Sequence, residues 1–318
     1  MSPIYVPGKI VFDSGNRPAA IAGVAPTLDY RFARERREIE AVSLTDKLTY
    51  TGANGTFMGS DGFIQQATTN APRFDHDPVT GESLGLLIEE ARTNLMLNSG
   101  TTAEMRPTAS TSRTSGGFAA PDGSTDASRV DLPEVTQPGR VEIVSEILGV
   151  SPNTDYIASV YLKGLNGGEV VYLTLESSVP TSSVTATLTT EWQRFDITGL
   201  SNSGVLYFNV GVDTRIGTGQ SNQPAQSFYI WGAQVEEGSF PTSYIPTVSS
   251  TVTRTADSAI IDGAGVLTGT YTMIEKPASC AVESGGNIEL QAGYTAERVM
   301  VFPAALSAQQ ITDIRSAM

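Results

Sequence analysis

Tyrosines and polar side chains alternate along several short, β-branched segments, and together they have the chemistry needed to bind a sugar. Tyr172, Tyr207 and Tyr229 each stand among valine, leucine, isoleucine or phenylalanine, as strand residues do. A tyrosine ring offers an apolar face on which a sugar can stack, and a hydroxyl that forms hydrogen bonds. Amide, carboxylate and guanidinium groups supply further donors and acceptors for sugar hydroxyls. The predicted glycan-binding residues are Tyr172, Tyr207, Asn209, Asp213, Arg215 and Tyr229.

Residues for catalysis or metal binding form no recognised pattern in the sequence. His76 is the single histidine and lies between two aspartates, whereas a zinc site needs several ligands. The sequence has neither a phosphate-binding loop nor a Gly-x-Ser-x-Gly turn. We therefore expect that the protein is not an enzyme and binds no cofactor. We interpret the segment around His76 as a polar turn. Two alternatives stay open. The protein could bind a structural divalent cation such as calcium, or it could be a glycosidase, which needs only two carboxylates.

Glu89 and Glu90 follow an apolar run and are adjacent in sequence. Adjacent residues of a strand point to opposite faces, so these two carboxylates are not a catalytic acid and base. We expect Arg92 to pair with one of them.

The elements that position these side chains are short strands. Eight apolar, partly alternating segments are separated by glycine, proline and asparagine at nearly regular spacing, which predicts an all-β, jelly-roll β-sandwich. These segments are 127–132, 139–148, 155–163, 169–177, 183–188, 193–197, 205–212 and 228–231.

The last of these strands leads into a segment through which the chain should leave the sandwich. Gly232 is expected to end the strand, and residues 236–238 (Glu-Glu-Gly) to form a turn. Pro241 and Pro246 then favour an extended conformation for the residues that precede them. The sequence thus predicts one turn followed by an extended exit.

The remaining chain divides into regions by composition. Residues 1–47 contain four prolines and a charged stretch, and they predict an extended N-terminal arm that attaches to a partner. Residues 48–97 predict a connecting region with a β-hairpin, and 98–247 the sandwich. Residues 248–318 predict a small β unit that ends in a helix over 307–317, for which Ser307 is a suitable N-cap.

Composition and charge limit the function classes. The 318-residue chain has a formal net charge of −14, which disfavours nucleic acid as a partner because such binding needs a positive surface. Its single cysteine excludes an intrachain disulfide. We expect no signal peptide and no membrane insertion, because the sequence lacks the apolar stretches that both require.

Several sequence blocks resemble one known group of proteins. WGAQVEEG at 231–238, TSYIPT at 242–247 and TRTAD at 253–257 are similar to the ending of carbohydrate-binding-like β-sandwich domains in structural proteins of tailed bacteriophages. NAPRFDHD at 70–77 and GLLIEEARTNLMLN at 85–98 resemble the segment that precedes such domains. The tail at 298–311 (RVMVFPAALSAQQI) resembles the last strand and helix of concanavalin A-like sandwiches. The residues that carry the structural motif are Trp192, Trp231, Gly232, Tyr244 and Pro246.

This resemblance implies a protein on the surface of a virion, of the head-spike, head-fibre, tail-fibre or collar type, assembled in the host cytoplasm. It implies adsorption to glycans of the host surface and attachment to other virion proteins, for which residues 1–47 are our candidate. A homo-oligomer, with a trimer favoured, is the expected assembly. Two alternatives stay open: a decoration or cement protein that binds no sugar, and a virion-bound polysaccharide depolymerase.

Overall fold

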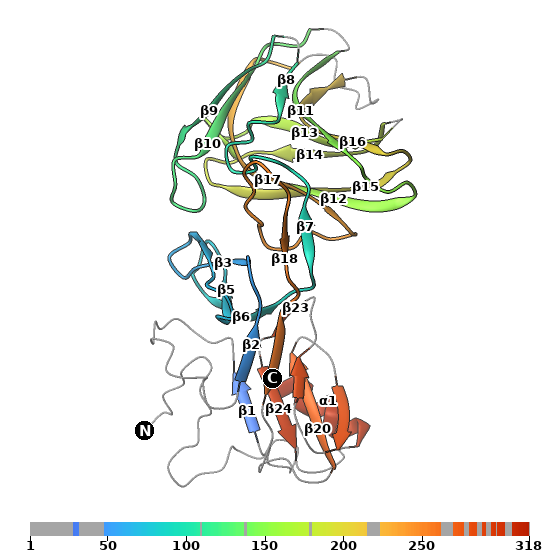
Figure 1. Ribbon diagram of the computed structural model, residues 1–318. Helices are drawn as coiled ribbons and strands as arrows, with labels where there is room; N and C mark the ends of the chain where they lie inside the picture. Colours follow the sequence, from blue (N-terminus) through green and yellow to red (C-terminus); the bar gives the residue numbers. More distant parts are fainter. Residues whose placement is uncertain are drawn as a thin grey trace. The chain divides into compact units, whose positions relative to one another are not determined.

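The computed structural model divides the chain into two compact units (Figure 1). The sandwich unit is Arg92–Arg254, and the flanking unit combines Met1–Ala91 with Thr255–Met318. The described residues are 28–31, 48–108, 110–136, 139–177, 180–214, 223–261, 270–276, 280–284, 288–290, 294–296, 298–302 and 307–317. Nearly all elements in this part of the chain are strands, so the predicted all-β class is confirmed.

Two five-stranded antiparallel sheets form the sandwich. The sheet that we call the β12 sheet contains, in spatial order, β15 (Gln193–Ser201), β12 (Thr154–Gly164), β17 (Gln226–Glu237), β10 (Ala127–Leu132) and β9 (Ser112–Phe118). The β16 sheet contains β14 (Pro180–Thr187), β13 (Val170–Glu176), β16 (Val205–Asp213), β11 (Arg140–Leu148) and β8 (Arg106–Pro107). Two further short strands, β7 (Arg92–Asn94) and β18 (Val252–Arg254), pair with each other where the chain enters and leaves the unit.

The core lies between the two sheets and is built from every second residue of their strands. Leu206, Phe208 and Val210 of β16 are fully buried, as are Val160 and Leu162 of β12. Burying an apolar side chain of this size contributes about 1.5–3 kcal/mol each. The alternation that gives each strand one apolar face therefore fixes which side chains remain on the outer face of each sheet, turned away from this core.

All eight predicted strands are present, but the last one is longer than expected. Gly232 does not end the strand: β17 continues to Glu237, so only Gly238 of the expected turn lies outside it. Gly232 has φ 66° and stands at a register shift between β12 and β17, which is a β-bulge. A glycine adopts this conformation without the steric penalty of a side chain, so the strand bends and continues.

After β17 the chain folds back along the same strand and is held there by buried side chains. Gln234 accepts a hydrogen bond from the backbone of Ile245 at 2.7 Å, and Glu236 accepts one from Thr242 at 3.1 Å. Arg254 is fully buried and donates to the Thr242 hydroxyl at 3.1 Å. The polar residues of the sequence blocks at 231–247 and 253–257 thus fix the exit from the sandwich.

Early and late segments of the chain combine in the flanking unit. Its elements are β1 (Leu28–Arg31), β2 (Leu48–Thr51), β3 (Thr56–Met58), β4 (Ile64–Gln66), β5 (Arg73–His76), β6 (Ser83–Ile88), β19 (Ser258–Ile261), β20 (Thr270–Lys276), β21 (Cys280–Ser284), β22 (Ile288–Leu290), β23 (Tyr294–Ala296), β24 (Arg298–Phe302) and α1 (Ala308–Ala317). β1 pairs with β24, β2 with β19, and β6 with β23. The regions 48–97 and 248–318, which we separated by composition, therefore share one unit into which the sandwich is inserted.

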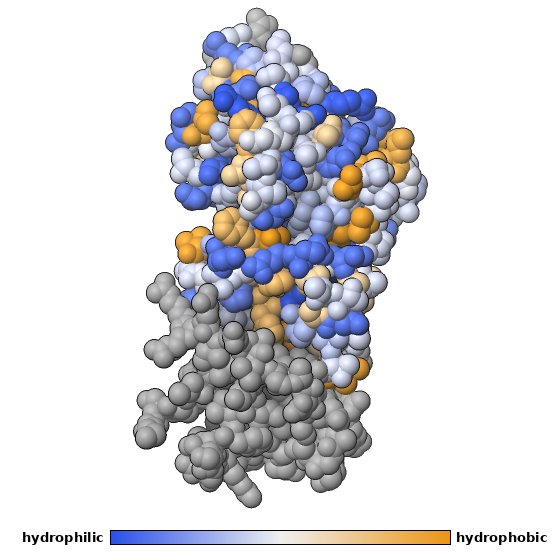
Figure 2. Space-filling model, turned by 60° about the vertical axis from the view of Figure 1, so that its left-hand side comes forward, coloured by the Kyte–Doolittle hydropathy of each residue, from blue (hydrophilic) through white to orange (hydrophobic). Residues whose placement is uncertain are grey.

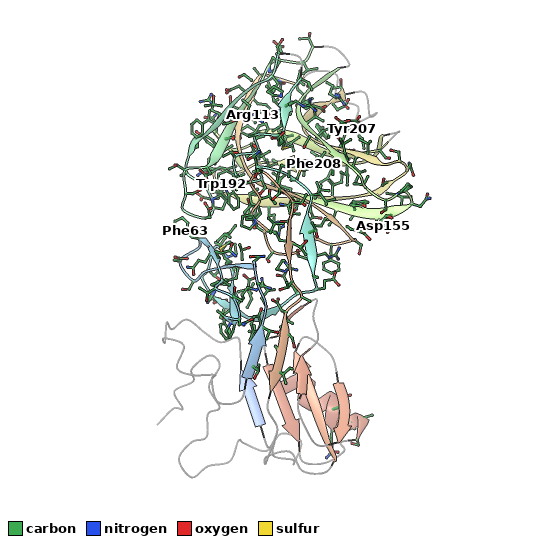
Figure 3. All side chains as sticks on the ribbon, in the orientation of Figure 1. Phe63, Arg113, Asp155, Trp192, Tyr207 and Phe208 are labelled. Atoms are coloured by element: carbon green, nitrogen blue, oxygen red, sulfur yellow. The ribbon has the colours of Figure 1, made fainter. Side chains whose placement is uncertain are left out.

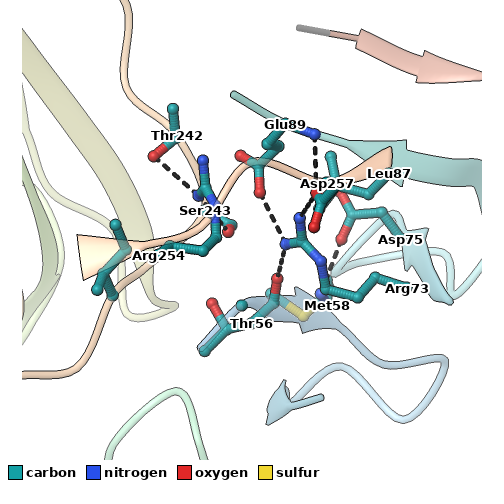
Figure 4. A network of polar contacts seen from close by, with 12 residues as sticks. Thr56, Met58, Arg73, Asp75, Leu87, Glu89, Thr242, Ser243, Arg254 and Asp257 are labelled. Carbon is teal, nitrogen blue, oxygen red and sulfur yellow. Dashed lines mark hydrogen bonds and ion pairs between the residues drawn. The ribbon is translucent and has the colours of Figure 1, made fainter. Parts of the chain in front are cut away.

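A buried ion-pair network joins the early and late segments of this unit (Figure 4). The Arg73 guanidinium contacts Glu89 at 2.7 Å and also pairs with Asp257. Glu89 thus has a partner, Arg73, on a neighbouring strand, and the pairing of Arg92 with Glu89 or Glu90 stays a prediction. Burial acts to lower the pKa of Arg73, but Glu89, Tyr50 and Asp257 raise it above its ordinary value. The guanidinium therefore remains charged.

The C-terminal helix is confirmed, and Ser307 caps it as expected. The Gln310 amide donates to the Ser307 hydroxyl at 3.3 Å, and the Ser307 amide donates to the Gln310 side chain at 3.0 Å. This reciprocal pair is a capping box. Of the predicted N-terminal arm, the described residues include β1, while 1–27 and 32–47 lie outside them. Within the described part of the chain, no helix has the length and apolar character to span a membrane.

Candidate functional site

The outer face of the β16 sheet gathers four of the six predicted glycan-binding residues. Tyr207, Asn209 and Asp213 alternate along β16 with the core residues described above. On the neighbouring strand β13, Tyr172 lies opposite Gly211 and Thr174 opposite Asn209. Directly opposed residues of paired strands project to the same face. One surface therefore carries all four side chains.

Charged residues from the adjoining strands share this face, and sequence analysis missed them. They are Arg106 on β8, Arg140, Glu142 and Glu146 on β11, and Glu176 on β13. Each of them stands at an outward position of its strand, but only the register of the strands shows that they meet. The only signal in the sequence was that each of these charged residues alternates with apolar residues along its own strand.

Ion pairs connect these charges across the sheet. The Arg140 Nε lies 2.6 Å from Glu142 Oε1, and its Nη1 lies 3.7 Å from Glu176 Oε2. Arg106 lies 3.6 Å from Glu146. The Tyr207 hydroxyl donates to Glu146 Oε1 at 3.1 Å. The face is thus a connected polar surface, with Tyr207 near its exposed edge.

The side chains on this face differ in how far solvent reaches them. Tyr172 is 4% exposed and Asn209 and Asp213 are each 2% exposed, although all three point away from the core. Tyr207 is half-buried. The ring of Tyr207 is therefore the one presented to a ligand, while Tyr172 and Asp213 support the surface from within.

Among the described residues, two buried acceptor atoms on this face have no hydrogen-bond donor. Asn209 donates through Nδ2 to the Thr174 hydroxyl at 2.8 Å, but its Oδ1 is unpaired. The Oε1 of Glu176 is unpaired as well. A buried polar atom without a partner costs about 1–3 kcal/mol, and solvent does not reach either atom.

The hydrogen bond between Tyr207 and Glu146 also changes the acidity of the tyrosine. The carboxylate of Glu146 accepts the phenolic proton and raises the pKa of Tyr207 above its ordinary value. The hydroxyl is protonated at neutral pH and donates to Glu146.

Tyr229, a further predicted glycan-binding residue, is not on this surface. Tyr229 belongs to β17 of the β12 sheet, on the opposite side of the core. Its ring centroid lies 5.1 Å from that of Phe118. One ligand cannot contact both Tyr207 and Tyr229. Arg215 lies outside the described residues.

The motif residues surround the exit segment. Trp231 is 1% exposed, and its ring centroid lies 5.5 Å from that of Tyr161 and 4.4 Å from that of Tyr244. The Tyr244 hydroxyl is 2.7 Å from the hydroxyl of Ser99. Pro246 is exposed directly beyond this cluster. Trp192 stands apart, half-buried just before β15.

No metal site is found among the described residues, since no three His, Cys, Asp or Glu side chains gather closely enough to hold an ion. His76 lies in β5, and not in the polar turn that we expected. Its Nδ1 is 2.9 Å from the carbonyl oxygen of Met58, so the ring contributes to strand packing.

The face of the molecule in Figure 2 shows the apolar residues of the sandwich in small separate groups among hydrophilic ones. In Figure 3, Tyr207 and Trp192 lie in different parts of the sandwich, and Phe208 lies between its sheets. By strand register, the candidate site itself is a polar face that carries Tyr172 and Tyr207 among charged side chains.

Comparison with solved structures returns several carbohydrate-binding modules and also parts of enzymes. The TmCBM61 module solved with β-1,4-galactotriose has 16% identity and a TM-score of 0.33, over 46% of this chain and 99% of that one. The CBM22-1 xylan-binding domain of Paenibacillus barcinonensis Xyn10C has 10% identity and a TM-score of 0.34, over 49% and 99%. Tailspike protein 4 of bacteriophage CBA120 has 10% identity and a TM-score of 0.31 for its enzymatically active domain, over 46% and 21%.

No protein-family model matches the chain, and no curated protein matches its sequence. At these levels of similarity, no ligand or activity is carried over from the solved structures to this chain.

Proposed function

We propose that the sandwich unit binds glycans on the outer face of the β16 sheet. The observation that carries this proposal is a solvent-facing tyrosine, Tyr207, which lies among charged side chains of the neighbouring strands. Sugar rings have apolar faces that stack on tyrosine, and hydroxyls that form hydrogen bonds with carboxylates and guanidinium groups.

The charges on this face favour a neutral glycan. Its described residues include four carboxylates, on Glu142, Glu146, Glu176 and Asp213, but only two arginines. An anionic sugar would be repelled by this excess of negative charge. The ion pairs also favour binding without catalysis, because Arg140 engages both Glu142 and Glu176.

A neutral-glycan array, followed by titration calorimetry on the best ligand, tests this proposal. We expect dissociation constants in the millimolar to micromolar range, about 4–8 kcal/mol. Tyr207→Ala should weaken binding by about tenfold or more, because it removes both the stacking surface and a donor. Tyr229→Ala is the matched control on the other sheet and should bind neutral glycans like the wild type.

A decoration or cement protein without sugar binding is the second candidate. It is favoured by the burial of Tyr172, Asn209 and Asp213, which places most of the polar face within the protein. If no neutral glycan binds the wild type, or if Tyr207→Ala unfolds the sandwich instead of weakening binding, this second candidate replaces the first.

We further propose that the protein is displayed on a phage or phage-like particle. The support is the resemblance of the blocks at 70–77, 85–98, 231–247 and 253–257 to phage structural proteins. Residues 1–47 would attach it to other virion proteins, and a homotrimer would multiply weak contacts into useful avidity. Electron microscopy of particles that carry a tagged copy should show the tag on the outer surface. A tag found only in the soluble fraction of the lysate would contradict this assignment.

A further inference from the structure

The outer face of the β12 sheet carries a second set of aromatic and charged residues that the proposed site does not use. Tyr229 of β17 lies opposite Arg129 of β10 on one side and opposite Lys163 of β12 on the other. All three alternate with core residues of their strands, so they project to the outer face. All three are also half-buried and are therefore within reach of a ligand.

Trp192 extends this row by one strand. Trp192 directly precedes Gln193, the first residue of β15, which pairs with Leu162 next to Lys163. Figure 3 places Trp192 near the end of the sheet that is remote from Asp155, the second residue of β12. Tyr229 and Trp192 are thus separated by one intervening strand, or about 10 Å, which leaves room for an oligosaccharide along the row.

The two cations in this row, Arg129 and Lys163, are accessible to solvent. Arg129 donates to Asp131 at 2.9 and 2.7 Å through Nε and Nη2, and the Ser227 hydroxyl donates to the same carboxylate at 2.5 Å. This arrangement fixes the guanidinium beside Tyr229. Lys163 has no ion-pair partner among the described residues, and its ammonium group is available to an anion.

The next row of the same face adds a third cation. Arg194 lies opposite Tyr161, with its guanidinium carbon 5.4 Å from the centre of that ring. Its Nη2 donates to the Ser159 hydroxyl at 2.9 Å. Beside Tyr229 the face therefore presents Arg129 and Lys163, with the carboxylate of Asp131 paired to Arg129. Arg194 and Asp196 lie further along the same face, on β15.

We propose that the outer face of the β12 sheet is a second glycan site, specific for sugars that carry carboxylates. Tyr229 and Trp192 stack on two sugar rings of one chain. Lys163 and Arg129 bind the carboxylates of those sugars through charge-assisted hydrogen bonds. This site rests on its own residues and does not require the neutral-glycan site.

The test uses the full chain and three acidic polysaccharides, namely polygalacturonate, alginate and hyaluronate. Each is compared with its carboxyl-reduced form, in which every carboxylate has become a primary alcohol. We expect affinity electrophoresis to show binding of at least one acidic polysaccharide, and loss of that binding after carboxyl reduction. Added salt should weaken the binding, because the charges are exposed to solvent.

Variants separate the two sites. Lys163→Gln and Arg129→Gln should each weaken binding of the acidic polysaccharide about tenfold, as expected for one charge-assisted hydrogen bond, and Trp192→Ala should weaken it similarly. Tyr207→Ala should leave this binding unchanged, and Lys163→Gln should leave neutral-glycan binding unchanged.

Three results would overturn the second site: no binding to any of the three polyanions, wild-type binding by Lys163→Gln, or equal loss of acidic binding in Tyr207→Ala. None of them bears on whether the β16 sheet binds neutral glycans, since that is measured with uncharged ligands and with Tyr207→Ala.

Discussion

Replacing Arg73 with alanine is expected to destabilise the flanking unit by about 3–5 kcal/mol. Arg73 is 1% exposed and forms ion pairs with Glu89 and Asp257. It also donates to the Thr56 carbonyl at 2.7 Å. Removing the guanidinium takes this counter-charge from two buried carboxylates, which is the costly way to break such a network. Urea denaturation followed by amide hydrogen exchange will measure the loss and locate it in β5, β6 and the segment around Asp257.

Arg106→Ala is the matched control for this experiment. Its side chain is 71% exposed and lies 3.6 Å from Glu146, so its loss should change stability by less than about 1 kcal/mol. If Arg73→Ala behaves like Arg106→Ala, the network does not hold the early and late segments together. Amide protection lost only in the sandwich unit would likewise contradict the assignment.

Replacing Trp231 with alanine is expected to destabilise the sandwich unit by about 3–5 kcal/mol. Its ring is 1% exposed and packs between Tyr161 and Tyr244. The substitution removes a large buried surface and leaves a cavity beneath the exit segment, which hydrogen bonds to Gln234 and Glu236 also hold. Thermal and chemical denaturation followed by intrinsic fluorescence of Trp192 will measure the change, since that tryptophan is retained.

Leu148→Ala provides the comparison, because Leu148 is an apolar side chain with 70% exposure. Its truncation should change the free energy of unfolding by no more than about 0.5 kcal/mol. A Trp231→Ala protein as stable as Leu148→Ala would show that the aromatic cluster does not anchor the exit segment.

The two outer faces of the sandwich would give the protein complementary ligand preferences. Glu146 and Glu176 lie opposite Tyr207 or bonded to it, whereas Arg129 and Lys163 lie opposite Tyr229. The hydrophobic core separates the two faces, so both can be occupied at once. Simultaneous binding to a neutral and a carboxylated polysaccharide would raise avidity without a larger site.

Local patterns in the sequence were sufficient to predict the strands. β10 was predicted with its observed bounds of Ala127–Leu132, because alternation and flanking turn residues are local properties. The helix α1 and its Ser307 cap were predictable for the same reason. β9 was missed because its sequence, SRTSGGF, is rich in serine and glycine and has few β-formers.

Alternation along one strand shows that Tyr207 and Asn209 share a face, but not which strands lie beside them. The sequence therefore grouped Tyr229 with Tyr207, while the tertiary structure places them on different sheets. It also could not show that Arg73 meets Asp257, 184 residues further along the chain. Strand formation depends on neighbours in sequence, whereas sites and ion-pair networks depend on which strands pair, and pairing is decided by packing of the whole core.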